Sequence, residues 1–258
     1  MKRIATAAVL IPAVAYVALW GPHWLFLLVL SVAALLSFRE YCSIVAAHRI
    51  EAPGPAGYAA GLLVLLVPKG EILLVTLITL LALGLMLRSA DMAKALPSAA
   101  AFLLGIVYVF GAWRCAVPLR AVSPYWLFFA LTLSWVGDTA AFAAGRALGK
   151  HKLAPRLSPA KSWEGSIASL VVCLAFGFFY LGWLIPEVTP VARLVIAAAG
   201  NIAGQVGDLA ESQMKRGAGL KDSGTLLPGH GGWLDRVDST LFAVPVIYGL
   251  LLLLERFW

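Results

Sequence analysis

The segment from Ser212 to Asp238 holds a dense group of side chains that could bind a metal ion and phosphate groups. Its acids, bases and single histidine are Asp222, Asp235, Asp238, Lys215, Arg216, Lys221, Arg236 and His230. Magnesium prefers carboxylate and phosphate oxygens, while lysine and arginine neutralise the remaining phosphate charge. Several glycines between these residues permit close approach of the backbone to a ligand. The segment therefore predicts a site for a metal ion and phosphates.

Asp235 and Asp238 are three residues apart at the predicted start of the last helix. At this spacing both carboxylates can reach one cation. Acids in a first helical turn also favour the helix dipole without any function, so this pair alone leaves both interpretations open. Asp208, at the end of the preceding apolar run, shifts the balance towards metal binding.

The apolar run that contains Asp208 has polar residues along one helical face. Asn201, Gln205, Asp208 and Ser212 follow at intervals of four, three and four, with Glu211 beside them. A carboxylate within a membrane span costs about 3 kcal/mol, so Asp208 is expected to face a cavity and a partner. Hydrogen bonds between helices are the simpler explanation of Asn201 and Gln205.

The composition indicates an integral membrane protein. The 258 residues are 61% hydrophobic and 13% charged, and soluble domains have about a quarter charged residues. The net charge of +7 comes from bases in short loops between apolar runs, where the positive-inside rule explains many of them. A lipid bilayer is thus the predicted partner, and nucleic acid is not.

The apolar runs predict an all-α, polytopic fold with about nine transmembrane helices. Their expected ranges are 4–20, 24–40, 55–68, 71–87, 97–118, 124–144, 165–185, 190–210 and 239–255. The run at 55–68 is short and flanked by prolines, so whether it crosses the whole membrane stays open. We expect a single membrane domain overall, with transmembrane scaffold helices in residues 1–122 and a catalytic transmembrane region in 123–258.

The loop from Arg146 to Glu164 is strongly basic, which predicts a cytoplasmic location. Two predicted spans separate this loop from the Ser212–Asp238 segment. An even number of crossings returns the chain to the same side, so both polar passages should face the compartment that contains nucleoside triphosphates.

Two blocks of motif residues stand out in the C-terminal half of the chain. The first runs from Ser212-x-x-Lys215-Arg216 through Lys221-Asp222-Ser223-Gly224 and Pro228-Gly229-His230-Gly231-Gly232 to Asp235-Arg236-x-Asp238. The second comprises Asp138-Thr139, Gly145-Arg146, Gly149-Lys150, Pro155 and Ser158 to Gly165. Together the two blocks resemble those of the phosphatidate cytidylyltransferase (CDP-diacylglycerol synthase) family, and the resemblance covers about the C-terminal half. Phe142 stands where the family suggests Tyr, and Ser162 where Thr is common.

The resemblance implies a membrane enzyme that condenses CTP with phosphatidic acid to form CDP-diacylglycerol and pyrophosphate, with Mg²⁺ as cofactor. A lipid phosphate oxygen would attack the α-phosphorus of CTP in line, so no strong general base is needed. The resemblance also implies a homodimer. The expected location is the bacterial cytoplasmic (inner) membrane, with the active site facing the cytoplasm.

The resemblance assigns roles to residues of both blocks. The expected metal ligands are Asp208, Asp235 and Asp238, with Glu211 as a further candidate. The expected catalytic phosphate ligands are Lys215, Arg216, Lys221 and Arg236. Further substrate contacts are expected from Ser158, Lys161, Ser162, Ser212, Asp222, Ser223, His230, Gly231 and Gly232.

Three further residues have alternative roles. Arg146 and Lys150 could guide the lipid phosphate or belong to a surface patch for anionic lipids. Asp138 is a second candidate for a buried acid, and it could contact the magnesium ion or a bound monovalent cation.

Two other functions fit parts of the sequence. A CTP-dependent lipid kinase of the polyprenol type would release CDP, but the motif from Lys221 to Asp238 argues against it. An ion-coupled transporter would explain acids such as Asp138 and Asp208 within spans. The transporter hypothesis is weakened because no inverted repeat is detectable and the polar residues lie on one side.

Overall fold

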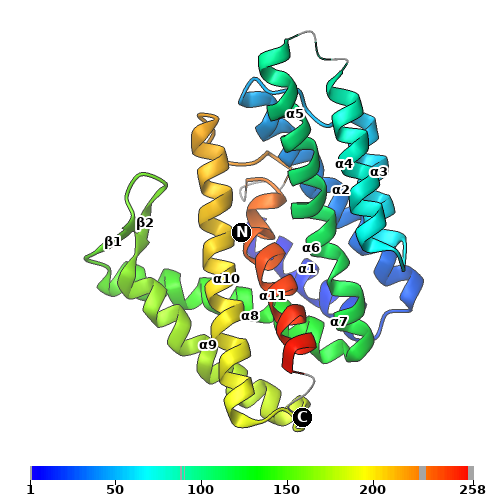
Figure 1. The fold of residues 1–258 in the computed structure, drawn as a ribbon. Helices are drawn as coiled ribbons and strands as arrows, with labels where there is room; N and C mark the ends of the chain where they lie inside the picture. The colour runs from blue at the N-terminus through cyan, green and yellow to red at the C-terminus, as the bar shows by residue number, and fades with distance from the viewer. Residues whose placement is uncertain (1, 88, 90, 227–230, 255–258) are drawn as a thin grey trace. The chain divides into compact units, whose positions relative to one another are not determined.

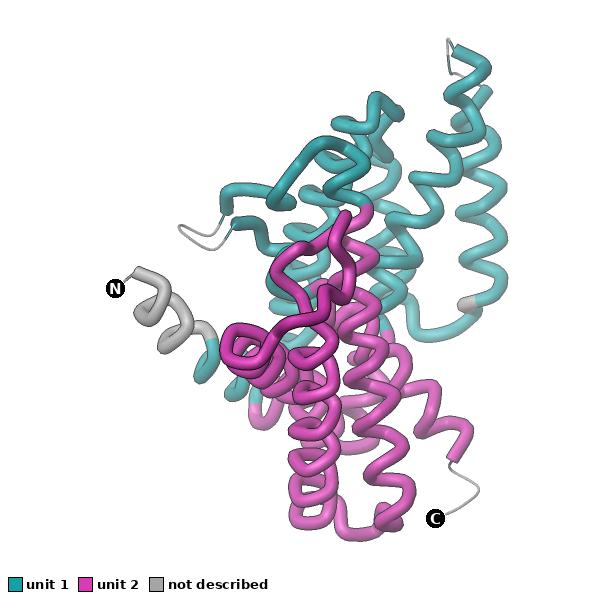
Figure 2. The backbone as a smooth tube through the Cα atoms, turned by 90° about the vertical axis from the view of Figure 1, so that its left-hand side faces the viewer, with its two compact units in different colours: residues 1–17, 21–114, 214–237 teal, residues 18–20, 115–213, 238–258 magenta. Residues whose placement is uncertain are grey.

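The computed structural model describes residues 2–87, 89, 91–226 and 231–254 (Figure 1). The predicted site residue His230, with Pro228 and Gly229, lies outside the described residues. Two compact units are distinguished, and Figure 2 colours them separately. Unit 1 consists of residues 1–17, 21–114 and 214–237, and unit 2 of residues 18–20, 115–213 and 238–258.

Unit 1 consists of the N-terminal helices and most of the polar segment. Its elements are α1 (Lys2–Leu19, whose last residues belong to unit 2), α2 (His23–Ala47), α3 (Gly54–Leu66), α4 (Glu71–Met86), α5 (Met92–Gly105), the π-helix η1 (Ile106–Gly111), α6 (Ala112–Arg114) and the 3-10 helix η2 (Leu234–Arg236). Residues 214–237 thus pack with the helices expected to be only a scaffold. The division into a scaffold and a catalytic region stays a prediction, and the compact units follow another division.

Aromatic residues form the core of unit 1. Phe38 and Phe110 are fully buried, with ring centroids 5.0 Å apart. The Tyr41 hydroxyl donates to the carbonyl of Ala101 at 2.8 Å and so links α2 to α5. These contacts fix α2, the helix that holds part of the candidate site.

Unit 2 is built mainly from four long helices. Its elements are α7 (Ala116–Val122), α8 (Pro124–Leu148), β1 (Lys152–Ala154), β2 (Ser158–Ser162), α9 (Trp163–Leu184), α10 (Pro190–Gly217, whose last turn belongs to unit 1) and α11 (Asp238–Leu254). Helix α8 packs along α9. The antiparallel strands β1 and β2 form a hairpin between these helices (Figure 1).

Local signals explain where the helices of unit 2 begin. The Ser123 side chain accepts a hydrogen bond from the backbone N–H of Tyr125 at the start of α8, where Pro124 is the first residue. The Ser162 hydroxyl accepts from the N–H of Gly165 at the start of α9. Ser162, predicted to contact substrate, therefore caps a helix.

The prediction of a helical fold is confirmed, whereas the predicted number of nine membrane crossings is not. Over their described residues, the nine predicted ranges lie mainly in helices. Helices α2 and α10 continue past the predicted ends at 40 and 210, to Ala47 and Gly217, and residues 67 and 68 of the third range are not helical. By length and composition, the described part of the chain has four segments able to cross a membrane, namely α2, Met92–Val122, α8 and α9. Shorter apolar helices are Gly54–Leu66, Ile72–Met86 and Asp238–Leu254. The β-hairpin was not predicted, because its strands are too short to show a periodic pattern.

Candidate functional site

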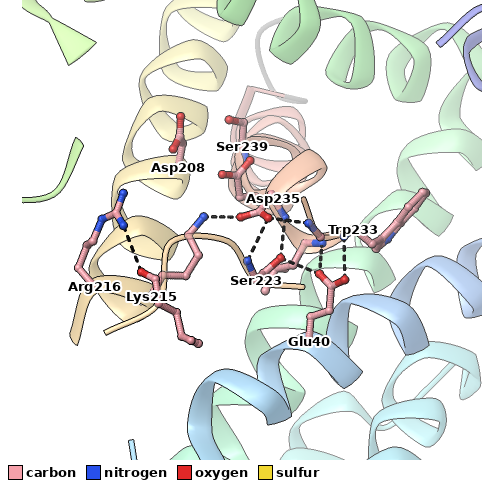
Figure 3. Close-up of polar contacts among 12 residues, drawn as sticks. Glu40, Asp208, Lys215, Arg216, Ser223, Trp233, Asp235 and Ser239 are labelled. Carbon is pink, nitrogen blue, oxygen red and sulfur yellow. Dashed lines mark hydrogen bonds and ion pairs between the residues drawn. The ribbon is translucent and has the colours of Figure 1, made fainter. Parts of the chain in front are cut away.

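A buried ion pair joins the end of α10 to η2 in unit 1. Lys215 Nζ pairs with Asp235 Oδ1, and their side chains are only 10% and 7% exposed. Asp235 Oδ2 accepts two backbone N–H groups, from Ser223 at 3.0 Å and Gly232 at 2.8 Å (Figure 3). Asp235 is therefore a centre around which the polar segment is folded.

The surroundings of Asp235 hold its carboxylate in the ionised form. Burial is the largest single influence and raises the pKa of Asp235, but the hydrogen bonds and charge of Lys215 and the N–H groups of Gly232 and Ser223 act in the opposite direction. Together they bring the pKa of Asp235 below its ordinary value. The carboxylate of Asp235 is thus charged at neutral pH.

Glu40 of α2 is a site residue that the sequence did not reveal. Its carboxylate accepts hydrogen bonds from the Ser223 hydroxyl at 2.7 Å, the Trp233 N–H at 2.9 Å and the Leu234 N–H at 2.7 Å (Figure 3). The only signal was an acid at the end of the predicted span 24–40. Positive-inside reasoning takes little account of such an acid.

The glycines of the polar segment make room for these two carboxylates. Gly231 has φ of +79°, in the left-handed region that glycine adopts readily. A Cβ on Gly231 would also lie 2.8 Å from Asp235 Oδ2. The N–H of Gly232, expected to contact substrate, instead donates to Asp235.

The other bases of the Ser212–Asp238 segment are exposed. Arg216, Lys221 and Arg236 all have solvent-accessible side chains, as does Asp222. Arg216 donates to the carbonyl of Leu220 at 3.2 Å, within its own turn. These three bases can therefore meet a charged ligand without first being uncovered.

In unit 2, the hairpin brings a second lysine to a predicted metal ligand. Lys161 on β2 pairs with Asp208 on α10, and their side chains are 26% and 30% exposed. Ser158 lies half-buried at the start of β2, and both Arg146 and Lys150 are exposed. Lys161 therefore contacts the predicted metal ligand Asp208. No such contact is described for Ser158, Arg146 or Lys150.

Acids in unit 2 act on one another. Burial raises the pKa of Asp238 at the start of α11, and the charges of Asp208, Glu211 and Asp138 raise it further. Glu211 is buried as well. Ser212, also buried, follows Glu211 in α10. The prediction that Asp138 is buried is wrong, since its residue is exposed near the C-terminal half of α8.

The described residues contain no group of three or more His, Cys, Asp or Glu side chains arranged to hold a metal ion. Asp208, Glu211 and Asp238 belong to unit 2, whereas Asp235 belongs to unit 1 and is engaged by Lys215. The assignment of all four as metal ligands stays a prediction.

Polar residues in the middle of α10 form hydrogen bonds to the neighbouring helix, as expected. Asn201 Nδ2 donates to Ser169 Oγ at 2.9 Å, and Gln205 pairs with Ser166, so both reach α9. Gln205 Nε2 also donates to Asn201 Oδ1 at 2.7 Å. A Cβ on Gly137 of α8 would lie 2.7 Å from Asn201 Nδ2, which explains the glycine there.

Comparison with known proteins places the chain in a family. A sequence model described as the cytidylyltransferase family matches residues 1–254. The chain belongs to the cytidylyltransferase family. The resemblance inferred from the two motif blocks is therefore confirmed, and the family match extends through the N-terminal helices that carry Glu40.

Several bacterial relatives bear the name phosphatidate cytidylyltransferase. The protein of Staphylococcus haemolyticus (strain JCSC1435) is 32% identical over 226 residues, which cover 85% of this chain and 86% of the relative. The protein of Staphylococcus aureus (strain COL) is 32% identical over 237 residues, covering 86% and 88%. The Haemophilus influenzae protein is 39% identical over 153 residues, and this match spans about half of each chain, 56% and 53%.

Proposed function

We propose that the chain is a phosphatidate cytidylyltransferase, a nucleotidyltransferase that converts CTP and phosphatidic acid into CDP-diacylglycerol and pyrophosphate. The observation that carries this proposal is the family match over residues 1–254, together with relatives of that name aligned over most of both chains. The basic and acidic residues of the two motif blocks supply the chemistry that the reaction needs.

The bases of unit 1 are suited to a triphosphate. Exposed Arg216, Lys221 and Arg236 can neutralise phosphate charge, and Lys215 is held in place by Asp235. A phosphate monoester already has a nucleophilic oxygen at neutral pH. The task of these residues is to bind the substrates and to stabilise charge on the leaving pyrophosphate.

The acids of α10 and α11 are suited to magnesium. Asp208 and Glu211 are three residues apart on α10, and their charges act on Asp238 of α11, so a divalent cation would relieve their mutual repulsion. Carboxylate oxygens are the ligands that Mg²⁺ accepts, with substrate phosphates completing its coordination. When bound, the ion would neutralise phosphate charge and make the α-phosphorus more electrophilic.

Lys161 balances the charge of Asp208. We propose that Lys161 would also bind a phosphate oxygen of the substrate. Asp138, exposed on α8 and electrostatically linked to Asp238, is the proposed neighbour of a monovalent cation.

The proposal includes a location and an assembly. We propose nine crossings of the bacterial cytoplasmic membrane, with the basic hairpin and the polar segment on the cytoplasmic side. The positive-inside rule supports this orientation. A homodimer is proposed from the resemblance to the family.

The test is incubation of the purified protein in detergent with CTP, Mg²⁺ and phosphatidic acid, with both products measured. Pyrophosphate and CDP-diacylglycerol in equal amounts are expected. Release of CDP would indicate the lipid kinase instead. Absence of all products from folded protein would count against the proposal.

A further inference from the structure

We infer that Glu40 is a positioning residue for the proposed reaction. Its carboxylate holds Ser223 and the backbone of Trp233 and Leu234 in place, and this arrangement keeps Asp235 paired with Lys215. This inference rests on the proposed function, in which Lys215 acts on the substrate phosphates. In this inference Glu40 acts through the polar segment and not on the substrate itself.

Both carboxylate oxygens of Glu40 accept hydrogen bonds, although the residue is part of an apolar helix. Its residue is 6% exposed, and a carboxylate buried without partners would be strongly destabilising. Three donors converge on it: the Ser223 hydroxyl and the N–H groups of Trp233 and Leu234. Hydrogen bonds to a charged acceptor are about twice as strong as neutral ones, so these contacts fix the segment against α2.

Ser223 connects Glu40 to the buried ion pair. Its hydroxyl donates to Glu40 Oε2. The hydroxyl oxygen of Ser223 also accepts a hydrogen bond from the backbone N–H of Asp235 at 3.3 Å. Its own N–H donates to Asp235 Oδ2 at 3.0 Å. A shift of Ser223 therefore displaces Asp235, and with Asp235 the ammonium group of Lys215.

Two glycines show how closely the segment surrounds Glu40. A Cβ on Gly224 would lie 2.5 Å from Glu40 Oε1, and a Cβ on Gly232 would collide with Glu40 Oε2. The carboxylate thus fills the space that side chains at these positions would need. The indole N–H of Trp233 adds a further tie to α2, donating to the carbonyl of Ala33 at 3.1 Å.

The geometry requires an acid and not merely a polar side chain. All three partners are donors to Glu40, and glutamine would replace one acceptor oxygen with an NH₂ group. In Glu40→Gln at least one donor would face another donor. The variant keeps the size of the side chain, so it changes the hydrogen bonds with little change in packing.

The first test needs no turnover. Hydrogen exchange of the purified protein in detergent is compared between wild type, Glu40→Gln and the exposed control Glu51→Gln. We expect the amides of Ser223, Trp233 and Leu234 to exchange about 10-fold faster in Glu40→Gln only. Unchanged exchange at these amides would overturn the inference, whether or not the proposed reaction occurs.

The second test separates positioning from general loss of structure. Per folded molecule, kcat of Glu40→Gln is expected to fall about 10- to 100-fold, as for other residues that support catalytic groups, with KM for phosphatidic acid unchanged. Ser223→Ala should lower kcat similarly. The double variant should lose about as much as the less active single variant, because the two residues contact each other and act on the same segment.

The two measurements can each contradict the proposed role of Glu40. Wild-type kcat per folded molecule in Glu40→Gln, or losses that multiply in the double variant, would overturn it. Lack of pyrophosphate from wild type would refute the proposed function but leave the exchange test valid. If Glu40→Gln does not fold, Ser223→Ala, which removes only the hydroxyl, takes its place in both measurements.

Discussion

Two lysine–aspartate pairs show how the same chemistry differs with its surroundings. Lys215 and Asp235 are almost fully enclosed, whereas Lys161 and Asp208 are about a quarter to a third exposed. An exposed pair contributes at most about 1 kcal/mol, but removal of one partner from a buried pair costs about 3–5 kcal/mol. The two predicted metal ligands should therefore respond differently to the same substitution.

We expect Asp208→Asn and Asp235→Asn both to abolish magnesium-dependent turnover, but only Asp235→Asn to lower stability substantially. The loss should be about 3 kcal/mol for Asp235→Asn, which leaves Lys215 buried without its counter-charge, and below about 1 kcal/mol for Asp208→Asn. Thermal unfolding in detergent and pyrophosphate release measure the two effects. Equal melting temperatures, or wild-type kinetics in either variant, would contradict this assignment.

The lowered pKa of Asp235 also makes stability depend on pH. Because the folded state favours the carboxylate, the stabilisation is fully present above the ordinary pKa of about 3.9 and disappears as pH falls through the lower folded value. The difference in unfolding free energy between wild type and Asp235→Asn should be constant above about pH 5 and shrink below about pH 4. Melting curves of both proteins between about pH 3 and about pH 8 test this pH dependence. A difference that grows on acidification would refute the sign.

At the scale of elements, close packing of helices in unit 1 depends on particular glycines. A Cβ on Gly61 of α3 would run into the ring of Phe110, which is fully buried. Gly84 of α4 has open space where its Cβ would be. The two helices therefore offer a matched pair of positions, one packed and one free.

Gly61→Ala should destabilise the protein by about 1–3 kcal/mol, since a methyl group would have to displace an aromatic ring in a dense core. Gly84→Ala should cause no loss, because alanine removes backbone freedom from the unfolded chain without a clash. Melting temperatures in the same detergent compare them. Combining Gly61→Ala with Phe110→Leu should recover part of the loss. A larger loss at Gly84 than at Gly61 would contradict the packing argument.

At the scale of the whole molecule, the sequence was sufficient for the helices and the family but not for the contacts of the site. Apolar runs located the helical ranges because burial in lipid requires continuous apolar stretches. The motif blocks identified Lys215 and Asp235, but their pairing depends on how the chain folds between them. The role of Glu40 depends on contacts with residues 183 to 194 positions away in the chain. Periodicity contains no information on such contacts. It also missed the exposure of Asp138 and the helix-capping role of Ser162.

The proposed topology makes a prediction for the whole chain. Helices α9 and α10 lie between the basic hairpin and the polar segment, so counting two crossings puts Arg156 and Thr225 on one side and Glu187 on the other. All three residues are exposed and lie outside helices. Each can be replaced singly by cysteine in a chain that lacks Cys42, Cys115 and Cys173.

In intact cells, a membrane-impermeant thiol reagent should label Glu187→Cys but neither Arg156→Cys nor Thr225→Cys. In inverted membrane vesicles the pattern should reverse, because the positive-inside rule puts the basic hairpin in the cytoplasm. Denatured samples control for reactivity of each thiol. Opposite sidedness of Arg156→Cys and Thr225→Cys would mean that α9 and α10 do not both cross, and the two motif blocks could not then serve one cytoplasmic reaction.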